Sequence, residues 1–165
     1  DVGSGGGLPG IPLAITMPNV TFTLVESTKK KAMFLHKVVE QLSLDNVTII
    51  AERAENLATP DGGFRNIADA VIARAVGPLN VLLELTIPFA KIGGVVVAIK
   101  GEKAPQEIED ATKALHVLRS EIESSTRSTT GTILMIRKKE ATPKAYPRQA
   151  GEPKRAPIGR KGVSH

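Results

Sequence analysis

Short apolar runs alternate with amphipathic stretches along most of the chain. Runs rich in β-branched residues predict strands, whereas apolar residues that recur every three or four positions predict helices. The predicted strands are residues 21–25, 47–51, 68–73 and 95–99. The predicted helices are residues 8–15, 29–42, 79–87 and 105–118. Strands that alternate with helices in this way indicate an α/β fold with a doubly wound, Rossmann-like sheet.

Two weaker strand patterns follow the last predicted helix, at residues 119–123 and 132–136. They predict an antiparallel closing pair, so the sheet is expected to be mostly parallel. The run at 68–73 is apolar apart from Asp69, as expected for a strand that is buried on both faces.

Composition excludes several classes of protein. The chain has 165 residues, of which 41% are hydrophobic, enough for one domain with its own core. Its longest apolar run is far shorter than the roughly 18 residues of a membrane helix. There is no cysteine, which excludes disulfides, thiolate metal sites and a cysteine nucleophile. We therefore expect no membrane anchor and no metal.

Basic residues are concentrated at the C-terminal end. Residues 137–165 contain nine Lys or Arg, two Glu and four Pro, whereas the preceding part is slightly acidic. We therefore predict a folded domain, residues 1–136, followed by a basic tail, residues 137–165, that is extended when free. Such a tail favours a polyanionic partner, and a solvated terminus is the alternative. The lysines at 29–31 are interpreted as a solvated helix face.

The chain begins with a glycine-rich stretch after an acidic residue. Asp1 is followed by Gly3, Gly5 and Gly7, and a helix start comes next. Such a loop can hold a dinucleotide or S-adenosylmethionine against its backbone N–H groups. A dinucleotide fingerprint would place its third glycine where Leu8 stands. The G-x-G-x-G spacing resembles motif I of methyltransferases that use S-adenosylmethionine, in which the acidic residue handles the methionine amino end.

Charged residues also stand at the ends of the following predicted strands. Glu26 lies about twenty residues beyond the glycines, where Rossmann-like proteins bind ribose hydroxyls. Ala54 and Glu55 follow the next strand and are predicted to border an adenine. Arg74 ends the strand at 68–73, where this fold places substrate chemistry. The alternatives are a surface role for Glu26 and an ion pair of Arg74 with Glu55 or Asp1.

Several segments together resemble one family, the ribosomal small-subunit RNA methyltransferase G family, also called glucose-inhibited division protein B. The segments that carry the likeness are DVGSGGGLPGIPLAI, LVES, AERAE, ARAV, IKG and TPKAYPRQAGEPKRAPI. The resemblance implies a class I S-adenosylmethionine-dependent methyltransferase fold. It also implies that the first strand and an N-terminal helical segment of the family are missing here, so the chain is interpreted as a fragment. The family's cofactor contacts fall on Gly3, Leu8, Glu26, Ala54, Glu55 and Arg74.

The activity that the resemblance implies is methylation of N7 of one guanine in small-subunit ribosomal RNA, naked or in an assembling subunit. Guanine N7 carries a lone pair and no proton, so no general base is expected and Arg74 is predicted to act by positioning. The predicted RNA contacts are Lys100, Lys144, Tyr146, Arg148, Lys154 and Arg155. As the alternative to RNA binding, the tail could pack on the sheet through Tyr146 and Pro147.

The expected setting is a monomer in the cytoplasm, with the plastid stroma as the other compartment. Two other functions stay open. A nucleotide-dependent oxidoreductase could use the same glycine loop and Glu26, although the glycine spacing is against it. An RNA-binding module without catalysis would keep the fold and lack cofactor affinity.

Overall fold

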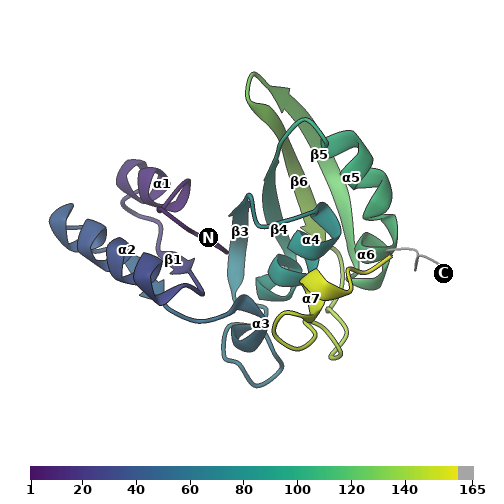
Figure 1. The fold of residues 1–165 in the computed structure, drawn as a ribbon, viewed down its shortest axis with the longest axis horizontal. Helices are drawn as coiled ribbons and strands as arrows, with labels where there is room; N and C mark the ends of the chain where they lie inside the picture. Colours follow the sequence, from purple (N-terminus) through teal and green to yellow (C-terminus); the bar gives the residue numbers. More distant parts are fainter. Residues whose placement is uncertain (160–165) are drawn as a thin grey trace.

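The computed structural model describes residues 1–159, and the end of the predicted basic tail, residues 160–165, lies outside this part. Its elements alternate along the chain as the hydrophobic pattern predicts (Figure 1). The strands are β1 (Phe22–Val25), β2 (Val47–Ile50), β3 (Ala68–Arg74), β4 (Ala90–Lys100), β5 (Ser120–Ser128) and β6 (Gly131–Lys138). The helices are α1 (Gly10–Thr16), α2 (Lys29–Gln41), α3 (Ala54–Leu57), α4 (Leu79–Thr86), the 3-10 helix η1 (Ile87–Phe89), α5 (Ala104–Asp110), α6 (Thr112–Val117) and α7 (Glu152–Arg155).

The strands form two sheets that residues 1 and 2 connect. β1 pairs with β2 in parallel, and the second sheet has the order β3-β4-β6-β5. Val25 N–H donates to the Asp1 carbonyl at 2.9 Å, and Val2 N–H donates to the Ile72 carbonyl of β3 at 2.9 Å. Because β3 and β4 are parallel and β6 is antiparallel to both neighbours, the predicted mixed α/β sheet is confirmed.

The boundaries of several elements differ from the prediction. β4 begins at Ala90, five residues early, and the predicted helix at 105–118 is divided into α5 and α6 at Ala111. The closing pair is longer than predicted, since β5 reaches Ser128 and β6 reaches Lys138. The weak hydrophobic pattern of β5 explains its prediction as a short strand, because most of its residues after Ser120 are exposed.

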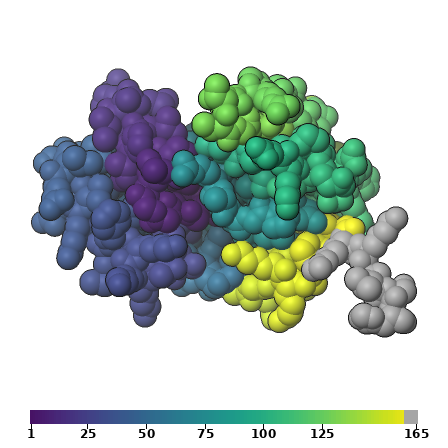
Figure 2. Space-filling view, turned by 45° about the horizontal axis from the view of Figure 1, so that its top comes forward, coloured from purple at the N-terminus to yellow at the C-terminus, as the bar shows by residue number. Residues whose placement is uncertain are grey.

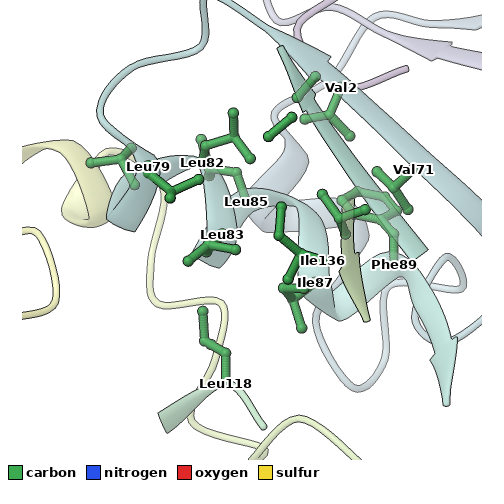
Figure 3. Close-up of a cluster of buried hydrophobic side chains, with 14 of the residues drawn as sticks. Val2, Val71, Leu79, Leu82, Leu83, Leu85, Ile87, Phe89, Leu118 and Ile136 are labelled. Carbon is green, nitrogen blue, oxygen red and sulfur yellow. The ribbon is translucent and has the colours of Figure 1, made fainter. Parts of the chain in front are cut away.

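The main core lies between α4 and the four-stranded sheet. Every residue of α4 is buried, and Leu79, Leu82 and Leu83 have no exposed surface. Figure 3 shows these leucines grouped with Ile136 and Phe89. Truncating such a leucine to alanine typically costs about 2–5 kcal/mol of stability. A smaller cluster packs β1 against α1 and α2.

The C-terminal segment, defined here as residues 139–159, is folded onto the domain, which corrects the prediction of an extended tail. Tyr146 packs against the main core and Pro147 is buried. The guanidinium group of Arg65 donates to the carbonyls of Thr142 and Tyr146, both at 2.7 Å. In Figure 2 this segment, in yellow, lies against the body of the molecule beside atoms coloured teal. The alternative of packing through Tyr146 and Pro147 is therefore the one observed.

Two kinds of feature are absent from the described residues. Within residues 1–159, no helix has both the length and the apolar character needed to cross a membrane. The same residues contain no cluster of three or more His, Asp or Glu side chains placed to hold a metal ion.

Candidate functional site

The glycine loop between Asp1 and α1 is tightly folded. Gly7 N–H donates to the Ser4 carbonyl and Ile11 N–H donates to the Gly7 carbonyl, both at 2.7 Å. Gly7 has φ +94°, and a Cβ there would lie 2.6 Å from Cγ1 of Ile11 and 3.1 Å from Cδ2 of Leu35. Only glycine therefore fits at this position, where the loop turns against α1 and α2.

The Asp1 carboxylate lies beneath this loop with one oxygen unused. Its Oδ2 accepts a hydrogen bond from Gly10 N–H at 3.0 Å. Its Oδ1 is buried and has no hydrogen-bond partner among the described residues. A buried acceptor without a partner costs roughly 1–3 kcal/mol. A cationic donor such as the amino group of a methionine moiety fits this oxygen.

Glu26 directly follows β1 and is held by two backbone donors. Gly5 N–H binds its Oε2 at 2.8 Å, and Thr28 N–H binds its Oε1 at 2.7 Å. Burial alone would raise the pKa of Glu26, but these N–H groups and nearby Lys31 outweigh it and keep the pKa below its usual value. The side chain is therefore an ionised acceptor, and its remaining lone pairs can bind the two hydroxyls of a ribose.

Glu55 follows β2 and binds the C-terminal segment. Its Oε1 accepts from Nη2 of Arg53 at 2.7 Å and from Gly151 N–H at 2.8 Å. Burial raises the pKa of Glu55, and the Arg53 and Gly151 donors lower it further than burial raises it. Oε1 of Glu55 is thus already bonded within the protein, so the predicted contact with an adenine is limited to Oε2. Ala54 is buried beside it.

A hollow of about 230 Å³ lies at these strand ends. It brings together four predicted cofactor residues, Gly3, Glu26, Ala54 and Glu55. Asp1, Gly5, Gly7, Leu8 and Arg74 are not among the residues that line it. The lining that sequence reasoning missed comprises Val2, Val25, Ser27, Thr28, Lys31, Glu52, Arg53, Ala75, Val76 and Leu85, together with Lys154, which was predicted to bind RNA.

Arg74 is exposed at the end of β3. Neither Asp1 nor Glu55 pairs with it, since Glu55 binds Arg53 and Asp1 binds Gly10 N–H. The alternative role of an internal ion pair is therefore not observed in the described part of the chain. The role of Arg74 in positioning cofactor or RNA stays a prediction.

Two of the predicted RNA-binding cations are bound inside the protein, which corrects their assignment. The buried Nζ of Lys100 donates to the Gly77 carbonyl at 2.6 Å and lies 2.7 Å from Oε2 of Glu107. The Nε and Nη2 of Arg148 bind the two oxygens of Glu84 at 2.9 and 2.6 Å. Arg148 compensates the fully buried carboxylate of Glu84, and Glu107 compensates the buried ammonium group of Lys100. Unpaired buried charges are very costly.

The other predicted RNA contacts differ in exposure. Tyr146 is half-buried, and the guanidinium carbon of Arg148 lies 6.0 Å from the centroid of its ring. Lys144, Lys154 and Arg155 are exposed and remain available to a polyanion.

The charged residues that organise the C-terminal segment were missed from the sequence. The only signal was a charge inside an apolar helix, as Glu84 is within α4, because such a charge requires a partner. Sequence alone did not identify which distant cation would supply it. Arg65 and Glu84 are the missed residues that bind this segment directly. Three further charged residues with internal partners were also missed, Arg53, Glu107 and Lys138.

Comparison with known proteins gives a family and a fold. A model of the family described as rRNA small subunit methyltransferase G matches residues 1–136. The chain is 47% identical over 149 residues to ribosomal RNA small subunit methyltransferase G of Sorangium cellulosum, covering 89% of this chain and 61% of that protein. It is 41% identical over 164 residues to the protein of the same name from Lactobacillus johnsonii, covering 96% and 68%. The chain thus spans about two thirds or less of the length of these relatives.

Solved structures agree on the fold. M. jannaschii TYW2 in complex with AdoMet has a TM-score of 0.61 and 20% identity, covering 81% of this chain and 63% of that one. A SAM-dependent methyltransferase from Aquifex aeolicus has a TM-score of 0.64 and 16% identity, covering 82% and 79%. At these identities the likeness establishes the fold alone, which is that of S-adenosylmethionine-dependent methyltransferases.

Proposed function

Because this chain belongs to the rRNA small subunit methyltransferase G family, we propose that it binds S-adenosylmethionine and methylates small-subunit ribosomal RNA. The observation that carries the cofactor assignment is the Oδ1 of Asp1 beneath the glycine loop, which has no hydrogen-bond partner within residues 1–159. A carboxylate there attracts the amino group of a methionine moiety and repels a pyrophosphate, which disfavours a dinucleotide.

Each remaining part of the cofactor has a fitting group in the site. The ionised Glu26 would hold the ribose hydroxyls, and the backbone beside Ala54 would border the adenine. When bound, the cofactor supplies a methyl group on a positively charged sulfur. The residues of this chain would bind and orient it, so that its reactive end is held in a fixed place at the hollow.

The proposed methyl acceptor is N7 of a guanine. This nitrogen has an in-plane lone pair and no proton to lose, so the site needs no general base. That requirement agrees with the site residues, since the carboxylates of Asp1 and Glu26 are committed to binding. Alignment of the guanine with the methyl group would then provide most of the rate enhancement, with exposed Arg74 as the positioning cation.

The proposed function is tested by calorimetric titration with S-adenosylhomocysteine and, separately, with NADH. We expect S-adenosylhomocysteine alone to bind, and Glu26→Ala to weaken it by about tenfold or more because two ribose hydrogen bonds are lost. Binding of NADH instead would favour the oxidoreductase. A folded chain that binds RNA and neither small molecule would identify the non-catalytic module. Nucleoside mass spectrometry of small-subunit RNA after incubation with cofactor identifies which nucleoside is methylated.

A further inference from the structure

We propose that the C-terminal segment forms one wall of the cofactor pocket, with Lys154 contacting the bound cofactor, so that cofactor binding and docking of this segment strengthen each other. The inference rests on the proposed function and adds a positioning element to it. It assigns to Lys154 a role different from the RNA contact predicted from the sequence. Three observations support it: the contacts of Gly151 and Arg148, and the position of Lys154.

The first contact joins the segment directly to the adenine side of the pocket. Gly151 N–H donates to Oε1 of Glu55 at 2.8 Å, and Glu55 lines the hollow. Gly151 reaches this geometry with φ +85°, a conformation that glycine adopts without strain. The same carboxylate oxygen binds Arg53, another lining residue. A shift of the segment would therefore change the hydrogen bonds of two residues in the pocket wall.

The second contact anchors the segment to α4. Arg148 uses its backbone N–H, its Nε and its Nη2 to bind the fully buried Glu84, at 2.9, 2.9 and 2.6 Å. Leu85, the next residue of α4, lines the pocket. The segment is thus fixed at two positions, Arg148 and Gly151, shortly before Lys154. Figure 1 shows α7, which carries Lys154, beside α4.

The third observation is that Lys154 lines the hollow. Lys154 belongs to α7, is exposed, and lines the same hollow as the carboxylates of Glu26, Glu52 and Glu55. Those carboxylates only accept hydrogen bonds, whereas adenine ring nitrogens and ribose oxygens need donors. An ammonium group with three donors at this position supplies them. The segment therefore contributes a donor to a wall in which most other charged groups are acceptors.

Coupling follows from linkage. A ligand that contacts Lys154 binds more tightly when the segment is docked, and by the same free energy it favours the docked segment. Lys144 and Arg155, which are free to contact RNA, lie in this segment. Occupation of the pocket would therefore hold these cations in place for RNA.

The test compares Lys154→Ala with the control Lys139→Ala, which removes another exposed lysine of the segment, away from the pocket. Calorimetry with S-adenosylhomocysteine should show about a fivefold loss of affinity for Lys154→Ala, the size of one lost hydrogen bond, and no change for Lys139→Ala. Hydrogen exchange of the unaltered chain should slow at residues 148–156 when S-adenosylhomocysteine is added.

Equal affinity of the two variants, or unchanged exchange at Gly151, would overturn the inference and leave the proposed function intact. An unaltered chain without affinity for S-adenosylhomocysteine would reject both. Unfolding of each variant in urea checks that the mutated chains are folded under the conditions of the titration.

Discussion

Single carboxylates at successive strand ends determine what the site can bind. Asp1, Glu26 and Glu55 each accept at least one backbone N–H, and those bonds fix the direction of the carboxylate. Of these three carboxylates, only that of Asp1 keeps a buried oxygen without a partner among the described residues. At the residue scale, the site is therefore rich in hydrogen-bond acceptors. Its positively charged side chains are those of Lys31, Arg53 and Lys154.

Arg74 is the residue for which substitution is most informative. Its exposed side chain makes no internal ion pair with Asp1 or Glu55, so removing it should change the free energy of unfolding by less than about 0.5 kcal/mol. We expect Arg74→Ala to lower the rate of methyl transfer at least tenfold, about 1.4 kcal/mol of transition-state binding. Tritium transfer to small-subunit RNA measures it, with Arg127→Ala of β5 as an exposed control. Unchanged turnover would remove Arg74 from the site.

Lys138 is the buried cation whose titration should affect stability. Its Nζ donates to Oδ1 of Asn66 and to the carbonyls of Ile87 and Ala90, at 2.6, 3.1 and 2.9 Å. Burial, with a contribution from the charge of Arg65, lowers the pKa of Lys138 from 10.5 to about 8. The unfolded chain therefore binds more protons between pH 8 and 10.5, and the free energy of unfolding should rise with pH across that interval, by up to about 3 kcal/mol.

The pH dependence of Lys138 is measured by urea unfolding of the unaltered chain and of Lys138→Met. The difference between their free energies of unfolding should change with pH from 8 to 10.5, because other titrating groups cancel. Lys139→Met, an exposed neighbour paired with Glu121, should follow the unaltered chain. A constant difference for Lys138→Met would show that Lys138 titrates normally.

At the scale of elements, local patterns identified the strands and helices, and distant contacts determined what they bind. The Leu-rich α4 and the β-branched strands were predictable because their apolar spacing depends only on neighbouring residues. The folding of the C-terminal segment was not, because Arg148 meets Glu84 and Gly151 meets Glu55 across 64 and 96 positions. The glycine loop and Glu26 were predictable for the same local reason, whereas Lys154 entered the pocket only through that long-range docking.

Arg148 and Glu84, which join the C-terminal segment to α4, should stabilise the protein only when both charges are present. Arg148→Met leaves the buried carboxylate of Glu84 without its cation, so we expect a loss of about 3–5 kcal/mol in the free energy of unfolding. The double variant Glu84→Leu with Arg148→Met removes both charges and should recover most of that loss. Urea unfolding of both variants tests this expectation. A single variant that loses less than about 1 kcal/mol would show that water reaches Glu84.

At the scale of the whole molecule, docking of the C-terminal segment gives the protein a basic surface beside an acidic pocket. Lys144, Lys154 and Arg155 are exposed on the segment, and Lys154 reaches the hollow that Glu26 and Glu55 line. The segment is thus a structural part of the domain that also carries exposed cations. RNA held there would approach the cofactor at the carboxyl edge of the sheet, where doubly wound folds bind their ligands.

RNA binding through this surface predicts a specific salt dependence. Each lysine or arginine that neutralises a phosphate contributes roughly 0.7–0.9 to the slope of log affinity against log salt, so the double variant Lys144→Ala with Arg155→Ala should reduce the slope by about 1.5. Lys29→Ala with Lys30→Ala removes the same charge from α2 and should leave the slope nearly unchanged. Anisotropy titrations of small-subunit RNA from about 50 to 200 mM salt measure both. Equal flattening by the two variants would mean that RNA responds to net charge alone, and an unaltered slope in the first would exclude the C-terminal segment from the RNA interface.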